Sequence, residues 1–251
     1  MPPAELGPEQ FADALPELID IYATAMHYSA QTCRARMPLW LDHSRRAGFR
    51  CVVTLAASIG TTEYDDVRAA PAAAGRFSPA APPATHPDGH AAAAGTANGD
   101  EKLGGAGASA STTGAPEIAG FAYGYLGAPG QWWHGEVARG LGHRTDPPSP
   151  RAYFEDYFEL TELHVRPAYQ GRGLGEELLR TLLAPVTARA VLLSTPEGES
   201  RAWRLYRRLD FVDVLRDFRF TGDARPFAVL GRALPIGPEM RTASYSPAHV
   251  G

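Results

Sequence analysis

The spacing of apolar residues predicts alternating helices and strands, most clearly between residues 158 and 184. Residues 158–165 are largely apolar, with aromatic and β-branched side chains, which is typical of a buried strand. Pro167 ends this strand, because proline has no N–H group to donate to a neighbouring strand. A glycine-rich turn follows at residues 170–175, and leucine then recurs at every fourth position, as on one face of a helix. This section therefore predicts a strand, a tight turn and a helix in succession.

Similar patterns predict the remaining elements of the fold. Helices are expected at residues 11–28, 31–47, 131–141 and 200–209, and strands at 50–57, 117–126, 190–194, 212–220 and 227–234. The strand–helix–strand unit in the middle of the chain requires parallel strands, whereas strands that form hairpins are antiparallel. The predicted fold class is therefore α+β, with a mixed, mostly antiparallel central sheet flanked by helices on both faces.

A long segment of low hydrophobicity separates the first two predicted strands. Residues 59–116 consist mainly of Ala, Gly, Pro, Ser and Thr, so they bury too little apolar surface to offset the entropy of ordering them. Lengthening a hairpin loop to this extent costs only about 2 kcal/mol of closure entropy. We therefore predict one domain formed by residues 1–58 and 117–235, a disordered insertion at 59–116, and a loose tail at 236–251.

Composition and charge exclude several functional classes. The chain has 251 residues, of which 44% are hydrophobic, and a net charge of −4 that provides no electrostatic basis for nucleic-acid binding. The N-terminus lacks the basic and apolar regions of a signal peptide, and no apolar run is long enough to cross a membrane. These features predict a cytoplasmic protein that binds neither nucleic acid nor membrane, and they leave a homodimer open.

Cysteine, histidine and lysine usage limits the ligand chemistry. Cys33 and Cys51 have no metal-ligand spacing and are expected to be buried, reduced thiols. His86 and His90 are four residues apart, which suits a metal only on a helix, and the proline and glycine between them oppose a helix. We therefore expect no metal. Lys102 is the single lysine, so cationic contacts to a phosphate must come from arginine, which binds through two forked N–H groups.

The glycine-rich turn is the strongest candidate site in the chain. A helix that begins directly after glycines leaves several backbone N–H groups unpaired at its N-terminus, where they bind anions such as phosphate. Two familiar phosphate loops are excluded. Glu176 stands where a dinucleotide fingerprint needs its third glycine, and no Gly-Lys-Ser/Thr follows as a P-loop requires.

The turn and the strand before it closely resemble the acetyl-CoA motif of the GNAT N-acetyltransferase superfamily. That motif is a strand ending in L-x-V-x-P, matched at residues 163–167, followed by Q-x-x-G-x-G, matched at residues 170–175. A second match is A-x-x-L-Y-x-x-x-D-F at residues 202–211, where Asp210 replaces the glycine usual in the family. Aspartate tolerates a left-handed helix cap better than most residues. The resemblance covers most of the chain outside the insertion, including features of an uncharacterised bacterial subgroup.

The resemblance implies acetyl-CoA as co-substrate, lying along the central strand where it separates from its neighbour. The strand's backbone would pair with the pantetheine, and the turn would hold the pyrophosphate with help from Arg172 or Arg166. Glu199 stands where many members carry an asparagine that contacts the pantetheine, which leaves that contact open. The implied cofactor-binding residues are Leu163, His164, Val165, Gln170, Gly171, Arg172, Gly173, Leu174 and Gly175.

The resemblance also implies the catalytic residues. Glu159 occupies the position of the catalytic glutamate of the histone-acetyltransferase branch, and Glu162 is the second candidate for the base that deprotonates the acceptor amine. The two have opposite parity on a regular strand, but a bulge, common in this strand of the family, would change that. Tyr206 matches the tyrosine that donates a proton to the leaving thiolate. Plain structural roles remain the alternative for all three side chains.

These features predict an N-acetyltransferase that transfers acetyl directly to a primary amine in a ternary complex; the alternative is a catalytically silent acyl-CoA-binding sensor or scaffold. The acceptor, a small-molecule or peptide amine, is not encoded in a motif. Acidic residues between 155 and 162 suggest a cationic acceptor, although a solvated strand edge explains them equally well. Residues that either line an acceptor cleft or pack in the core are Met26, Tyr28, Met37, Trp40, Trp132 and Trp133.

Overall fold

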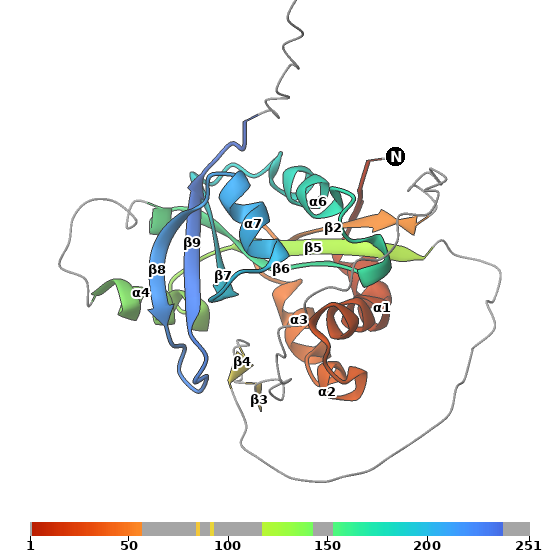
Figure 1. Cartoon of the computed structure of the whole chain (residues 1–251), viewed down its shortest axis with the longest axis horizontal. Helices are drawn as coiled ribbons and strands as arrows, with labels where there is room; N and C mark the ends of the chain where they lie inside the picture. Colours follow the sequence, from red (N-terminus) through yellow and green to blue (C-terminus); the bar gives the residue numbers. More distant parts are fainter. Residues whose placement is uncertain (1, 57–83, 86–90, 93–116, 143–152, 238–251) are drawn as a thin grey trace, which may run out of the picture.

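A seven-stranded mixed sheet forms the centre of the computed structural model, which describes residues 2–56, 84–85, 91–92, 117–142 and 153–237 (Figure 1). Its strand order is β1-β2-β5-β6-β7-β9-β8. The pair β6–β7 is parallel and the other five pairs are antiparallel. The strands are β1 (Ala4–Leu6), β2 (Arg50–Leu55), β5 (Ile118–Leu126), β6 (Tyr157–Val165), β7 (Ala190–Pro196), β8 (Val212–Phe218) and β9 (Phe227–Ala233).

Helices cover both faces of this sheet, as Figure 1 shows. Apolar side chains of α6 (Leu174–Leu183) pack on one face, together with α7 (Arg201–Arg208). The helices on the opposite face are α1 (Pro8–Met26), α2 (Ala30–Arg34), α3 (Met37–His43) and α4 (Trp132–Gly142). The predicted fold class, a mixed and mostly antiparallel α+β sheet with helices on both faces, is confirmed.

Two N-terminal predictions differ from the structure in detail. The helix expected at 31–47 is instead α2 followed by α3, and the break falls at Ala35 and Arg36. Pro38 explains the break, because it occupies the first turn of α3, where a missing N–H group costs nothing. The edge strand β1 was not predicted, since three residues are too few to show a periodicity.

The segment predicted as a disordered insertion falls mostly outside the described residues. Within it, the structure describes a short antiparallel pair, β3 (Ala84–Thr85) and β4 (Ala91–Ala92). The strands on either side, β2 and β5, pair with each other along the sheet, as the sequence predicted. The division into one domain, an insertion and a tail stays a prediction.

Strand β6 has two irregular features that shape the site. It pairs with β7 through only three residues, Tyr157 to Glu159, and in the described structure the ladder between the two strands stops there. Against β5 it contains a bulge, because Glu162 pairs with Tyr123 and Leu160 pairs with Gly124, which leaves Thr161 as an extra residue. A β-carbon at Gly124 would lie 2.1 Å from the carbonyl oxygen of Glu159, so only glycine fits opposite this bulge.

Candidate active site

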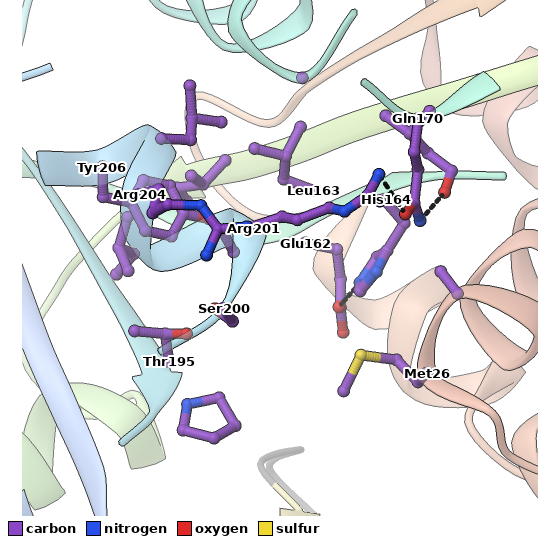
Figure 2. A pocket seen from close by; sticks show the side chains of 18 of the residues that line it. Met26, Glu162, Leu163, His164, Gln170, Thr195, Ser200, Arg201, Arg204 and Tyr206 are labelled. Carbon is purple, nitrogen blue, oxygen red and sulfur yellow. Dashed lines mark hydrogen bonds and ion pairs between the residues drawn. The ribbon is translucent and has the colours of Figure 1, made fainter. Parts of the chain in front are cut away.

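A cavity of about 1000 Å³ opens where β6 and β7 separate. Residues 160–165 of β6 line one wall, residues 193–196 of β7 line another, and α7 and the start of α6 complete it. The end of α1 and the turn between β8 and β9 border the same cavity. Figure 2 shows Glu162, Leu163 and His164 on one side of this space and Tyr206 on the other. The cavity therefore joins the predicted cofactor strand to residues far apart in the sequence.

The glycine-rich turn has the geometry expected of a phosphate loop. Gly171 and Gly173 have φ of +81° and +82°, which residues with a β-carbon adopt only with strain. The carbonyl of Gly173 accepts the N–H groups of Glu176 and Glu177 at 3.0 and 3.1 Å, so α6 begins at the glycines. The N–H groups before Glu176 lie in the first turn of a helix, where no helical carbonyl precedes them. The turn can hold an anionic phosphate.

Eight of the nine predicted cofactor residues line the cavity, and the exception is Arg172. The guanidinium of Arg172 lies 5.8 Å from the ring centre of Tyr169, which does line the cavity. Gln170 is held by its amide, which donates to the carbonyl of Val165 at 2.9 Å. The eight that line it are Leu163, His164, Val165, Gln170, Gly171, Gly173, Leu174 and Gly175.

Arginines of α7 line the cavity, whereas the two named from sequence, Arg166 and Arg172, are not among its lining residues. Arg201 reaches from α7 across the cavity, where its Nη1 donates to Oε1 of Gln170 at 3.4 Å (Figure 2), and Arg204 also lines it. Arg166 instead donates to the carbonyl of Ile118 and pairs with Glu17 and Glu117. The arginines at the start of helix 200–209 were visible in the sequence, but no motif tied them to the turn.

Glu162 belongs to a largely buried cluster of polar side chains at the cavity. Its Oε2 lies 2.7 Å from Nε2 of His164, and its Oε1 lies 3.7 Å from Nη2 of Arg36. Arg36 comes from the α2–α3 junction and also donates to the hydroxyl of Tyr22 at 3.2 Å. The ring of Tyr22 meets that of His164 edge to face at 5.0 Å. The carboxylate is thus held by one arginine and one imidazole while it faces the cavity.

Glu159 lies outside the residues that line the cavity. It is 1% exposed and accepts a hydrogen bond from the hydroxyl of Tyr125 at 3.1 Å. The bulge puts both glutamates on one face, because Glu159 pairs with Tyr125 and Glu162 with Tyr123. At Glu159, however, β7 is still paired with β6. The sequence-based preference for Glu159 over Glu162 therefore does not match the geometry, since only Glu162 lies beyond the point of separation.

Tyr206 lines the cavity from α7 and is 6% exposed. The helix begins at Ser200, whose hydroxyl accepts the N–H of Trp203 at 3.0 Å. Burial raises the pKa of the Tyr206 phenol well above its ordinary value, and the negative charge of Glu162 adds to this. The phenol therefore stays protonated at neutral pH and is available as a hydrogen-bond or proton donor.

The acceptor candidates divide between cavity and core. Met26 and Tyr28 line the cavity, whereas Trp40 is fully buried among the side chains of α1 and β5. Met37 packs against that same core, Trp132 stacks on Phe220, and the Nε1 of Trp133 donates to Ser194. Neither Trp132 nor Trp133 is among the lining residues. Besides the arginines of α7, lining residues that sequence reasoning missed include Tyr22, Arg36, Phe220, Arg225 and Phe227.

Other predicted features can be located as well. Cys33 and Cys51 are buried free thiols, and Asp210 adopts the left-handed conformation with φ of 58°. No helix in the described ranges has the length and apolarity to cross a membrane. Within those same ranges, His, Cys, Asp and Glu side chains form no group of three or more suited to a metal. His86, His90 and the Pro-rich loop at 143–150 lie outside the described residues.

Comparison with known proteins identifies the family. Residues 104–211 match the acetyltransferase (GNAT) family. The GCN5-like protein acetyltransferase Rv2170 of Mycobacterium tuberculosis is 41% identical over 237 residues, covering 92% of this chain and 97% of that protein.

Solved acetyltransferases are more distant. An acetyltransferase from Thermus thermophilus is 13% identical, covers 92% of this chain and 96% of its own, and has a TM-score of 0.45. A GNAT-family acetyltransferase from Bacillus cereus is 11% identical, covers 88% and 91%, and has a TM-score of 0.40. At these scores the structural likenesses add no argument. On the sequence match over nearly its whole length, the chain belongs to the GNAT family of acetyltransferases, which use acetyl-CoA as acetyl donor.

Proposed function

We propose that this acetyltransferase moves the acetyl group of acetyl-CoA to a primary amine by direct transfer in a ternary complex, with Glu162 as base and Tyr206 as acid. The observation that carries the proposal is that one cavity is lined by both side chains and by the phosphate-type turn. The acceptor is a small-molecule or peptide amine. The mycobacterial relative is named a protein acetyltransferase, so peptide amines are part of the test.

The donor fits the wall formed by β6 and the turn. The edge of residues 160–165 that β7 leaves unpaired offers backbone groups with which the amides of pantetheine can pair as another strand would. The N–H groups of the glycine turn suit the pyrophosphate. Arg201 and Arg204 add charge-assisted contacts there, in place of Arg172 and Arg166. A backbone N–H near Leu163 is the candidate to polarise the thioester carbonyl, which typically lowers the barrier by about 3 kcal/mol.

Glu162 is the candidate base for the acceptor amine. An amine with an ordinary pKa near 10 is neutral in only about one molecule in a thousand at pH 7, which costs roughly 4 kcal/mol. In the proposed reaction the carboxylate of Glu162 removes one proton from the ammonium, and His164, 2.7 Å away, takes that proton onward to water. Arg36 holds the other carboxylate oxygen and so fixes the direction of the base.

Tyr206 is the candidate acid for the leaving group. The neutral amine attacks the thioester carbonyl, a C–N bond forms, and the C–S bond breaks to release the thiolate of CoA. Tyr206 gives its phenolic proton to the sulfur, and the phenolate recovers a proton from the new amide nitrogen. Burial raises the pKa of this phenol, which keeps it protonated before the reaction but makes it a weaker acid, so its proton transfer to sulfur must be coupled to recovery of the amide proton.

The test is acetyl-CoA-dependent release of free CoA against a panel of small amines, peptide N-termini and lysine peptides. With an accepted amine, Glu162→Gln is expected to lower kcat by about 100-fold while the Kd of acetyl-CoA stays within about twofold. Glu155→Gln is the matched control, because Glu155 is exposed just before the same strand. Tight binding of acetyl-CoA without turnover of any amine would refute this proposal and favour the silent acyl-CoA-binding module.

A further inference from the structure

Arg225, in the turn between β8 and β9, presents a cation at the acceptor end of the cavity. Asp223 orients it, since Nε donates to Oδ1 at 3.0 Å and Nη2 donates to Oδ2 at 2.6 Å. The side chain of Asp223 is 0% exposed, and Asp223 is not among the lining residues, whereas the side chain of Arg225 is 31% exposed and lines the cavity. A molecule in the cavity therefore meets the guanidinium and not the carboxylate behind it.

Tyr28 accepts a third hydrogen bond from the same guanidinium. The Nη1 of Arg225 donates to the hydroxyl of Tyr28 at 3.1 Å. Tyr28 itself is placed by the end of α1, because its N–H donates to the carbonyl of Ala23 at 2.8 Å. A guanidinium carries five N–H donors, and these contacts use three of them, one on each nitrogen. One N–H on Nη1 and one on Nη2 have capacity for another acceptor.

The other arginine at this end of the cavity is differently placed. Arg36 pairs with Glu162, so the ligand meets a carboxylate and a guanidinium together at that point. Around Arg225, the cavity is lined by aromatic rings, those of Tyr28, Phe220 and Phe227. The guanidinium of Arg225 lies 5.4 Å from the ring centre of Phe227, which limits how it can turn. A pre-oriented guanidinium among aromatic rings suits an anionic group.

We propose that the amine acceptor carries an anionic group, a carboxylate or a phosphate, which Arg225 binds several bonds away from the reacting amine. The inference rests on the proposed role of Glu162 in receiving the amine. Three side chains link the two groups in turn: Arg225 donates to Tyr28, the ring of Tyr28 lies 5.9 Å from that of Tyr22, and Tyr22 accepts from Arg36 beside Glu162. On this arrangement we expect an ω-amino acid or a peptide amine as acceptor, and not an α-amino acid.

A purely structural role for Arg225 makes a different prediction. In a structural role, Arg225 would only connect the β8–β9 turn to the end of α1 through its hydrogen bond to Tyr28. Removing the Tyr28 hydroxyl would then have the same effect on ligands as removing the guanidinium. If Arg225 binds the anion, Tyr28→Phe keeps the charge and its pairing with Asp223, and so keeps the preference for anionic ligands.

The experiment measures binding of matched N-acetylated products to the full-length, CoA-loaded protein by calorimetry at low salt. The pair is 6-acetamidohexanoate and its carboxamide, with N-acetylglycine and its carboxamide as the short pair and 5-acetamidopentyl phosphate as the phosphate arm. The wild type should bind 6-acetamidohexanoate about tenfold more tightly than the carboxamide, with no such gap for the short pair. Arg225→Gln should reduce the gap to less than about twofold, and Tyr28→Phe should retain it.

Each other outcome overturns the proposal. The first two outcomes are that the wild type binds 6-acetamidohexanoate and its carboxamide equally, or binds no product at all. The other two are that Arg225→Gln keeps the difference in affinity, or that Tyr28→Phe abolishes it as completely as Arg225→Gln does. If Arg225→Gln does not fold, Arg225→Lys replaces it and should keep about threefold preference, because the charge stays while the fork is lost. Tighter binding of 5-acetamidopentyl phosphate than of 6-acetamidohexanoate would indicate that the anionic group of the acceptor is a phosphate. Failure of the proposed reaction is separate, since it would show as absent CoA release with the binding gap intact.

Discussion

The two sides of the cavity that we propose for the donor and for the acceptor are built in different ways. The donor side uses backbone: the open edge of β6 and the glycine turn before α6, which are contiguous in the chain from residue 160 to 175. The acceptor side uses side chains from separate segments, Tyr22 and Tyr28 at the end of α1, Arg36 at the α2–α3 junction, and Arg225 before β9. Backbone recognition constrains a local sequence pattern, whereas side-chain recognition from dispersed segments leaves no pattern. This difference explains why the donor is readable and the acceptor is not.

The strongest test of the backbone-built donor side is Gly173→Val. Its β-carbon would meet nothing within 4 Å, but φ is +82°, which a β-branched residue tolerates only at a cost of about 1–2 kcal/mol. The turn should rearrange, and acetyl-CoA binding should weaken by at least about 100-fold in calorimetry. Gly135→Ala is the control, since Gly135 lies in α4 with open space around it. Unchanged binding in Gly173→Val would disprove the phosphate assignment.

Tyr206→Phe tests chemistry at the boundary between the two sides. Loss of the phenolic proton should lower kcat by about 100- to 1000-fold, because the thiolate then leaves without its acid. The ring and its contact with Phe211 remain, so affinity for acetyl-CoA should change by less than about twofold. Steady-state kinetics and calorimetry on one preparation separate the two quantities. A parallel loss of binding and turnover would indicate that Tyr206 is part of the core instead.

Arg201→Gln sharpens the comparison by removing a side chain from the backbone-built side. Arg201 contacts Gln170 from across the cavity, and its loss should weaken acetyl-CoA binding by about fivefold, far less than the glycine substitution. The weakening should shrink when salt is raised, because charge screening already reduces the contact. Arg189→Gln, at an arginine whose side chain is 79% exposed beside β7, serves as control. A loss of affinity as large as that of Gly173→Val would contradict the view that backbone groups contribute most to acetyl-CoA binding.

The smallest expected effect concerns the link between α6 and α7. Burial alone would raise the pKa of Glu176, but hydrogen bonds from Arg208 and Arg180, with their charges, hold it below its ordinary value. A lowered folded-state pKa stabilises the fold above the unfolded pKa, and this contribution is lost as pH falls through the folded value. Glu176→Gln should therefore cost about 1 kcal/mol of unfolding free energy at pH 7 and clearly less near pH 3, below the ordinary pKa of a glutamate. Thermal unfolding at both pH values measures this, and an equal cost at both would exclude the charge explanation.

The elements predicted from periodicity are those with long, regular patterns. The helix beginning at Leu174 and the strand ending at Val165 were found because apolar spacing and glycines coincide there. The separation of α2 from α3 and the edge strand β1 were missed, since each is too short for a period to show. Boundaries depend on local hydrogen bonds that periodicity does not encode.

Which of the two glutamates of β6 faces the cavity depends on more than the sequence of that strand. Sequence identified both and recognised that a bulge would change their parity on the strand. The bulge itself depends on β5, where Gly124 leaves room for the displaced backbone, and the separation is a property of the pairing between β6 and β7. These are contacts between segments far apart in the chain, so the strand's own residues do not determine them.

The sequence by itself indicated the family and the donor through its resemblance to the acetyl-CoA motif, and the mixed sheet through apolar periodicity, because motif and period both lie within short stretches. Only the tertiary structure decided which glutamate and which arginines line the cavity, Arg36 and Arg225 among them. The physical reason is distance along the chain. Backbone torsions and strand or helix periods are local, whereas the position of a side chain in a cavity depends on packing between elements separated by up to 197 residues.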